Sequence, residues 1–203
     1  MKVKMMEVGP VITNCYIVEN EKTGHAVVVD PGDEGPRIVS ALKRENLTVD
    51  AILLTHGHLD HISGLKEVRE ATGAKVYMAA EDAERLTHAV SAFFPGPAKD
   101  FGAADVLVEE GQVIEAAGYT FKVLLTPGHT PGGCCYLTDD IVFCGDTIFA
   151  ESIGRTDFTK GSMSDLIRTV KEKLLVLPEY VRVYPGHNEE TTIEHERVYN
   201  PYF

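Results

Sequence analysis

The stretch Thr55-His-Gly-His-Leu-Asp-His61 carries the densest group of metal-ligand side chains in a chain of 203 residues. The chain has only 8 histidines, so a chance His-x-His-x-Asp-His pattern is expected on the order of once in a thousand such chains. A turn between a strand and a helix projects alternate side chains to one side, so His56 and His58 can share one ion while Asp60 and His61 face another. Imidazole and carboxylate together suit a divalent ion such as zinc, iron or manganese.

The residues on either side of this stretch predict a strand that leads directly into a helix. Asp50 to Thr55 is an apolar run typical of a fully buried strand. A helical pattern then runs from about His61 to Thr72 and is closed by Gly73, a residue that favours the C-terminus of a helix. A buried strand followed by a helix is typical of an α/β protein.

Strands and helices then occur in the same rough order twice along the chain. The other strands expected in the first half are Lys2 to Val8, Thr13 to Glu19, His25 to Asp30 and Ala74 to Met78. Those expected in the second half are Val106 to Val108, Gln112 to Ala116, Tyr119 to Leu125, Cys134 to Leu137, Ile141 to Cys144 and Val181 to Tyr184. Further helices are expected after Pro36, at Glu81 to Val90, at Ser164 to Leu177 and in a polar tail from Glu189. We therefore expect one domain over residues 1–203 with two pseudo-equivalent halves, about 1–105 and 106–203.

The segment 91–105 fits neither a strand nor a helix and is interpreted as an excursion over the surface. It contains Phe93-Phe94-Pro95-Gly96-Pro97. The paired aromatic rings either line a pocket or pin the loop by their burial. The same segment could instead contact another subunit, so the oligomeric state stays open.

Composition and charge exclude several classes of protein. Hydrophobic residues are 44% and charged residues 25% of the chain, as in ordinary folded proteins. The net charge of −12 and the lack of a basic stripe argue against a nucleic-acid partner. We expect neither a signal peptide nor a membrane anchor, because no apolar run approaches the roughly 18 residues that span a bilayer. The 4 cysteines lie in apolar stretches without disulfide-type spacing, which favours free thiols in a reducing cytoplasm.

Three more potential ligands lie at or just beyond the ends of apolar strands. They are His129, Asp146 and His187, and each has a glycine close by that permits a tight turn. Each has an alternative role when taken alone: a turn histidine, a cap and a surface residue. Together with the histidine cluster they predict one metal site with seven ligands.

These motifs resemble those of the metallo-β-lactamase-fold hydrolases, and within them the glyoxalase II-like (hydroxyacylglutathione hydrolase-like) branch. The resemblance rests on Thr55 to His61, Thr126-Pro-Gly-His129, Gly145-Asp146-Thr and Pro185-Gly-His187, and it extends over nearly the whole chain. It implies a four-layer αβ/βα sandwich. Two sheets would face each other with helices outside, and the active site would lie at one edge where loops of both halves meet.

Carried over residue by residue, the resemblance assigns His56, His58 and His129 to a first metal ion. It assigns Asp60, His61 and His187 to a second, with Asp146 bridging the two. It implies two divalent ions, with zinc favoured and iron or manganese as alternatives. A hydroxide shared by the ions would attack an acyl carbon, and Asp60 would be the catalytic residue that orients it. An aspartate at position 146 is unlike many lactam-cleaving relatives, and His58 differs from the glutamate of the flavodiiron relatives.

The implied substrate is a small-molecule thioester such as an S-2-hydroxyacylglutathione. Glyoxalase II proteins continue into a C-terminal helical region that helps to grip glutathione, whereas this sequence ends at Phe203. Arg155 is a candidate for binding a substrate carboxylate, and a structural ion pair with Asp157 is the alternative. Cleavage of a lactone or phosphoester is also open, as is metal binding without turnover. A rival reaction is that of a persulfide dioxygenase, which would use one iron bound by His56, His129 and Asp146.

Overall fold

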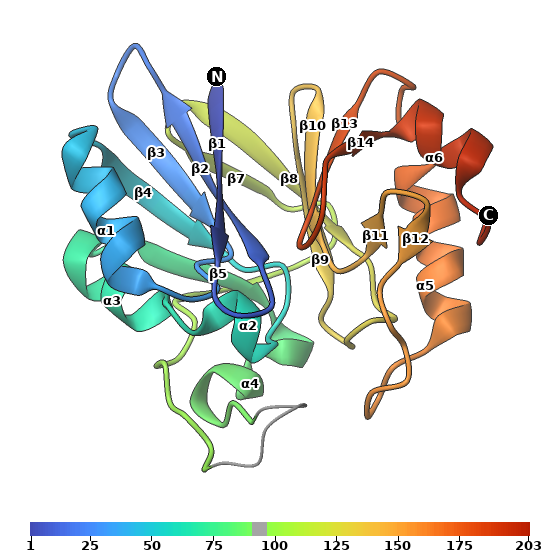
Figure 1. Ribbon diagram of the computed structural model, residues 1–203, viewed down its shortest axis with the longest axis horizontal. Helices are drawn as coiled ribbons and strands as arrows, with labels where there is room; N and C mark the ends of the chain where they lie inside the picture. Colours follow the sequence, from blue (N-terminus) through green and yellow to red (C-terminus); the bar gives the residue numbers. More distant parts are fainter. Residues whose placement is uncertain (91–96) are drawn as a thin grey trace.

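The computed structural model describes residues 1–90 and 97–203. Within these residues the chain forms two six-stranded sheets and a small two-stranded sheet. The two large sheets face each other, with helices on their outer faces (Figure 1). This arrangement confirms the predicted α/β class and the four-layer αβ/βα sandwich.

The first sheet begins as an antiparallel meander and continues as parallel strands. The meander comprises β1 (Lys2–Val8), β2 (Thr13–Asn20) and β3 (His25–Val29). The parallel strands that follow are β4 (Thr48–Leu53), β5 (Lys75–Ala79) and β6 (Val106–Val108). Parallel neighbours require a crossover connection. The segments that supply it are α1 (Gly35–Arg44), α2 (Leu59–Ile62), α3 (Leu65–Thr72), the 3-10 turn Ala80–Asp82 and α4 (Glu84–Thr87).

The second sheet has the order β14-β13-β10-β9-β8-β7. Its antiparallel part comprises β7 (Val113–Ala116), β8 (Tyr119–Leu125), β9 (Cys134–Thr138) and β10 (Ile141–Gly145). Between β10 and its parallel neighbour β13 (Arg182–Pro185) lie the hairpin β11 (Ile148–Phe149) and β12 (Ser152–Ile153), α5 (Met163–Thr169) and the π-helical Val170–Leu174. The chain ends with β14 (Thr191–Thr192) and α6 (Ile193–Tyr199).

Three hydrophobic cores hold the layers together, because successive residues of a strand point to opposite faces of a sheet. Ile17 and Val28 pack with the helices outside the first sheet, whereas Val18 and Val27 pack between the two sheets. A third core joins the second sheet to α5 and the π-helical turn, where Leu166 is fully buried. The core between the sheets is shared by both halves, which supports our proposal that residues 1–203 form one domain.

The first hairpin of the chain also contacts the end of β13. Asn14 N donates to the carbonyl oxygen of Gly186 at 2.7 Å, and Tyr16 Oη donates to that of Pro185 at 2.6 Å. Thr13 forms an isolated antiparallel bridge with His187. The early and late parts of the sequence therefore meet at the edge where both sheets end.

Several predicted elements are wrong in extent. The single helix expected from His61 to Thr72 is broken at Ser63 and Gly64, whose backbone N–H groups donate to the carbonyl oxygens of Gly32 and Pro31. Gly64 thus gives its donor to the loop after β3, whereas Ser63 shares its donor between that loop and the carbonyl oxygen of Leu59 in α2.

Other differences lie near the ends of elements. The helix expected at Glu81 to Val90 is reduced to a 3-10 turn and α4, and the one at Ser164 to Leu177 ends as a π-helical turn. The tail from Glu189 first forms β14 before it becomes helical. Phe93 and Phe94 lie outside the described residues, whereas Phe101 is buried in the first outer core.

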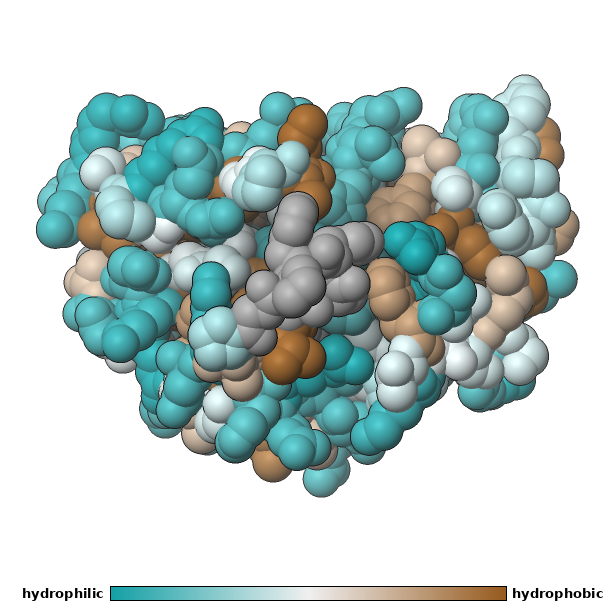
Figure 2. All heavy atoms as spheres, turned by 60° about the horizontal axis from the view of Figure 1, so that its bottom comes forward, coloured by the Kyte–Doolittle hydropathy of each residue, from teal (hydrophilic) through white to brown (hydrophobic). Residues whose placement is uncertain are grey.

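The face at the bottom of Figure 1 comes forward in Figure 2, where mostly hydrophilic side chains surround smaller hydrophobic patches. None of the helices in residues 1–90 and 97–203 has the length and hydrophobicity needed to cross a lipid bilayer. All four cysteines are free and buried, as the sequence predicts.

Candidate metal centre

The seven predicted ligands come together at one edge of the molecule, where strands of both sheets end. His56 and His58 follow β4 of the first sheet, and Asp60 and His61 lie in the short helix α2. The second sheet contributes the other three, each from the segment that follows a strand: His129 after β8, Asp146 after β10 and His187 after β13. In Figure 1, α2 lies low between the two halves of the sandwich. The loops of two sheets therefore supply one cluster.

His56, His58 and His129 form the first group of ligands. The Nδ1 atom of His58 lies 3.1 Å from Nε2 of His56 and 2.9 Å from Nε2 of His129. Their rings are nearly perpendicular to one another, with centroids 4.6 to 4.9 Å apart. Three ring nitrogens that converge from three directions in this way can bind one ion as a tripod.

Asp60, His61 and His187 form the second group. Oδ2 of Asp60 lies 3.2 Å from Nε2 of His187 and 3.6 Å from Nε2 of His61. The hydroxyl of Thr13 also donates to this carboxylate oxygen, at 3.3 Å. One carboxylate and two imidazoles thus converge beside the first group.

Asp146 lies between the two groups. Its Oδ2 atom is 3.4 Å from Nε2 of His129 in the first group. Its Oδ1 atom is 3.3 Å from Nε2 of His61 and 3.7 Å from Nε2 of His187 in the second. The two oxygens of one carboxylate therefore face different groups, as a bridging ligand would.

Two atoms of this cluster indicate that it fits divalent ions. Nε2 of His61 and Oδ1 of Asp146 are buried, and neither has a hydrogen-bond partner among the described residues. A buried polar atom without a partner costs free energy, so both atoms fit a role as metal ligands. Gly186 leaves the space open, because a Cβ atom there would lie 2.3 Å from Oδ1 of Asp146 and 2.6 Å from Cε1 of His61.

Oxygen atoms behind the cluster orient four of the five imidazoles. The Nδ1 atom of His61 donates to Asp30 at 2.9 Å, and that of His56 lies 3.1 Å from the Thr55 hydroxyl. Because the Thr55 hydroxyl donates its proton to Asp30 at 2.6 Å, it accepts from His56. In each ring the proton is then on Nδ1, and the lone pair of Nε2 faces the centre.

Backbone carbonyl groups orient the imidazole rings of His129 and His187. The Nδ1 atom of His129 donates to the carbonyl oxygen of Arg155 at 2.7 Å, and that of His187 donates to the carbonyl oxygen of Ile12 at 3.3 Å. Ile12 has a φ of 59°, an unusual conformation for a β-branched residue. These carbonyl contacts are absent from the sequence-based prediction, because any residue type supplies the same oxygen.

Burial and nearby charges shift the pKa values of histidines in the two groups in opposite directions. Burial lowers the pKa of His56, and positive charge on the neighbouring His61, or on His58 when that ring is protonated, lowers it further. Burial, His129 and the Arg85 cation lower the pKa of His58 to about 4. His56 and His58 therefore tend to be unprotonated.

The two histidines of the second group have raised pKa values and tend to be protonated. Burial alone would lower the pKa of His61, but the carboxylates of Asp146 and Asp30 outweigh burial and raise it well above its usual value. Burial also opposes protonation of His187, yet Asp60 and Asp146 raise its pKa. Burial would raise the pKa of Asp60, but the bond with His187 and the charge of His61 lower it to about 2.

Arg155 lies beside the cluster on the chain that follows β12. Its guanidinium group binds Asp157 through two hydrogen bonds of 2.9 and 2.8 Å, which is the ion pair that the sequence offered as an alternative. It also lies 4.8 Å from the ring centroid of Phe158, and that ring is 5.1 Å from the ring of His58. Arg155 and Phe158 therefore lie next to the first group, and a substrate role for Arg155 stays a prediction.

Relatives of this chain include proteins described as metallo-hydrolases. The chain matches the Metallo-beta-lactamase superfamily over residues 8–187. The probable metallo-hydrolase YqgX of Bacillus subtilis is 37% identical over 207 residues, which cover 100% of this chain and 97% of the relative. The hydroxyacylglutathione hydrolase GloC of Haemophilus influenzae is 30% identical over 212 residues, with 100% of this chain and 98% of the relative covered.

Solved structures agree over almost the whole chain. BLEG-1, described as a B3 metallo-beta-lactamase, has a TM-score of 0.94 and 36% identity, with 99% of both chains covered. ETHE1 from Myxococcus xanthus has a TM-score of 0.82 and 30% identity, with 99% of this chain and 84% of that chain covered. TTHA1623 in a di-iron-bound form has a TM-score of 0.82 and 32% identity, with 98% of this chain and 100% of that chain covered. The chain therefore belongs to the metallo-beta-lactamase superfamily.

Proposed function

We propose that this protein is a binuclear metal-dependent hydrolase that cleaves a small-molecule thioester, such as an S-2-hydroxyacylglutathione. One observation carries the proposal: two groups of three ligand atoms lie on either side of Asp146, whose two carboxylate oxygens face different groups. The name of the Haemophilus influenzae relative supports the choice of substrate.

The first ion would be held by His56, His58 and His129, the second by Asp60, His61 and His187, and Asp146 would contact both. Two divalent ions, with zinc favoured and iron or manganese as alternatives, would supply a water of lowered pKa and polarise the substrate carbonyl. A thiolate leaving group needs little protonation, which suits a site where metal ions would supply most of the electrophilic assistance.

The chain's own residues would orient the reactants. Asp60 is anionic at neutral pH, because its pKa is lowered to about 2, and it can accept a hydrogen bond from the attacking water. The hydroxyl of Thr13 fixes the orientation of that carboxylate. The ring of Phe158 provides an apolar surface beside His58 for part of the substrate, and Arg155 is the candidate for a substrate carboxylate.

The test combines metal stoichiometry with turnover. Protein purified without added metal is analysed for bound ions and is then assayed with S-D-lactoylglutathione under anaerobic conditions. We expect about two ions per chain and thioester cleavage without oxygen. A β-lactam and a lactone serve as comparison substrates, because BLEG-1 is described as a B3 metallo-beta-lactamase.

A second candidate is a persulfide dioxygenase that uses one iron. It is favoured by the similarity to ETHE1 from Myxococcus xanthus together with the presence of His56, His129 and Asp146 in the same cluster. About one iron per chain, no thioester cleavage, and oxygen consumption with glutathione persulfide would establish this candidate and overturn the hydrolase.

A further inference from the structure

Asp82 is a fully buried carboxylate outside the metal centre, at the end of the 3-10 turn that follows β5. Its Oδ2 atom accepts a hydrogen bond from the backbone N–H of Gly57 at 2.9 Å, and its Oδ1 atom accepts one from the backbone N–H of Gly132 at 3.0 Å. Nε of Arg85 lies 3.6 Å from Oδ1. An ionised carboxylate is tolerated in such a place only when hydrogen bonds and an opposite charge compensate its burial.

The two donors belong to the two loops that carry the first group of ligands. Gly57 lies between His56 and His58, in the loop after β4 of the first sheet. Gly132 lies three residues after His129, in the loop after β8 of the second sheet. One carboxylate therefore joins loops from opposite halves of the sandwich, and both of these loops carry ligands of the first group.

Both loops are packed against this segment without space for a side chain. A Cβ atom on Gly132 would lie 2.6 Å from the backbone nitrogen of Asp82, and one on Gly57 would lie 2.6 Å from Cβ of Arg85. Only glycine at each contact lets the loop backbone reach the carboxylate. The segment from Asp82 to Arg85 thus defines where each loop lies.

We propose that Asp82 is a positioning residue that sets the distance between the loop of His56 and His58 and the loop of His129, and so controls how tightly this first group binds its ion. The inference rests on the proposed function, because it assumes a metal ion at the first group. The second group has its own support in Asp30, which binds His61 directly. Loss of Asp82 therefore affects one group and spares the other.

The experiment measures zinc affinity at one group at a time. In a His187→Ala background, which removes a ligand of the second group, competition with a chromogenic chelator reports the first group. In a His58→Ala background the same titration reports the second group. Asp82→Ala and Asp82→Asn are made in both backgrounds, and the Asn variant keeps the volume and one acceptor oxygen.

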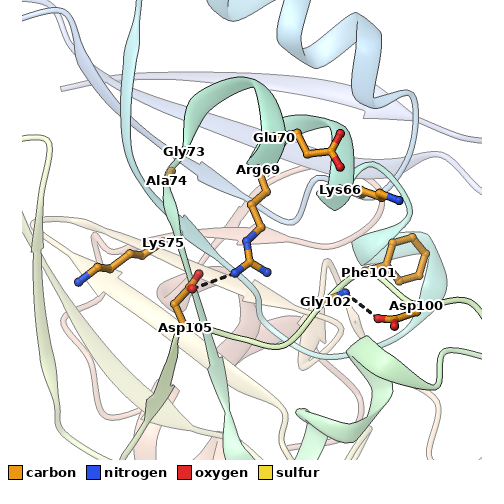
Figure 3. Close-up of a pocket in the computed structure, with 10 residues that line it drawn as sticks. All are labelled: Lys66, Arg69, Glu70, Gly73, Ala74, Lys75, Asp100, Phe101, Gly102 and Asp105. Carbon is orange, nitrogen blue, oxygen red and sulfur yellow. Dashed lines mark hydrogen bonds and ion pairs between the residues drawn. The ribbon is translucent and has the colours of Figure 1, made fainter.

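Asp105→Asn is the matched control. Asp105 also accepts a backbone N–H, that of Val76 at 2.8 Å, and pairs with Arg69 at 2.8 Å in the pocket beside α3 (Figure 3). Neither partner belongs to the metal centre. This control therefore separates general destabilisation from an effect on the ligands.

We expect Asp82→Ala to weaken zinc binding at the first group by about 10- to 100-fold, with a smaller loss for Asp82→Asn. Binding at the second group and in the Asp105→Asn control stays unchanged. Unchanged zinc affinity at the first group, even with a lower melting temperature, would overturn the inference and leave Asp82 a purely structural residue. If neither group of the parent protein bound zinc, the proposed function would fail together with it.

Discussion

Each imidazole has two ring nitrogens, and its value as a metal ligand depends on which one carries the proton. In this protein Asp30 is placed to decide this for His61, because it accepts the Nδ1 proton at 2.9 Å. Asp30 also accepts from the backbone N–H and the hydroxyl of Thr55, and the latter in turn contacts His56. A single carboxylate therefore orients ligands of both groups, one directly and one through a hydroxyl.

Asp30→Asn tests that orientation. An amide in place of the carboxylate removes the negative charge beside His61, so we expect about 10- to 100-fold weaker binding at the second group and a smaller loss at the first. Metal content after dialysis against increasing chelator measures both. Asp140→Asn, which changes an exposed aspartate beside Arg182, is the control. Retention of two ions at wild-type chelator concentrations would contradict the role of Asp30.

The shifted pKa values predict that acid would release the two proposed ions in sequence. His61 and His187 have raised pKa values in the metal-free protein, so binding at the second group must displace protons, and its affinity falls as the pH falls. The pKa of His58 is lowered to about 4, and that of His56 is also lowered, so protons compete at these two ligands of the first group only in stronger acid.

We therefore expect the ion of the second group to leave first on titration from about pH 8 to pH 4. A chromogenic chelator in solution would record two steps, and His187→Ala would remove the earlier one. Release of both ions in a single step, or survival of the earlier step in this variant, would show that the two groups do not differ in this way.

The sequence predicts the metal ligands better than it predicts the groups that hydrogen-bond to them and orient them. All seven ligands stand out because four lie in one His-x-His-x-Asp-His motif and the other three follow a glycine near the end of an apolar strand. Asp30 can be recognised in the sequence as an acid before Pro31-Gly32. Its hydrogen bond with His61 spans 31 residues, so no local pattern predicts that contact. The carbonyl groups of Ile12 and Arg155 belong to the backbone, so the pattern of side chains does not reveal them. Nothing in the sequence distinguishes Asp82 from other acidic residues, because only the fold brings Gly57 and Gly132 into contact with it.

At the scale of elements, short turns after strands determine the geometry of the centre. The turn after β13 passes so close to Asp146 and His61 that only glycine fits at position 186. Gly186→Ala is expected to displace a ligand and to reduce metal content, with a lower melting temperature as a secondary effect. Metal analysis and thermal unfolding measure the two effects separately.

Gly73→Ala is the control for that variant. Gly73 ends α3 with a φ of 69°, and a Cβ atom added there would meet no packed neighbour within 4 Å among the described residues, so the substitution adds only backbone strain of roughly 1 kcal/mol. Its metal content should equal that of the wild type. If Gly186→Ala also kept its full metal content, the close approach of this turn would have no role in shaping the centre.

The elements that the sequence misjudges are those whose hydrogen bonds go to distant partners. Hydrophobic periodicity places most strands and the long helices within a few residues. This periodicity predicts that Ser63 and Gly64 are helical. Their backbone hydrogen bonds to the loop after β3 cannot be predicted from a pattern of side chains. The short strands β11, β12 and β14 have two residues each, too few for an alternating pattern to be seen.

At the scale of the whole molecule, the candidate metal centre draws its ligands from both sheets. Because ligands from both sheets bind the ions only in the folded state, bound metal should stabilise the protein by mass action. An ion present at 1,000 times its dissociation constant would contribute about 4 kcal/mol. We expect a chelator to lower the melting temperature and added zinc to restore it, as followed by circular dichroism. A melting temperature that is the same with and without metal would argue against ligands shared between the sheets.

The contact between the first hairpin and the end of β13 has a consequence for protein synthesis. Strands β1 to β5 leave the ribosome well before His187 does, so a growing chain exposes His56, His58 and His61 while their partners are still missing. A chain interrupted before Pro185 lacks both a ligand of the second group and the carbonyl groups that Asn14 and Tyr16 bind. The proposed set of ligands would thus be complete only once His187 has left the ribosome, so metal bound at both groups would report that the chain has been synthesised through β13 and His187.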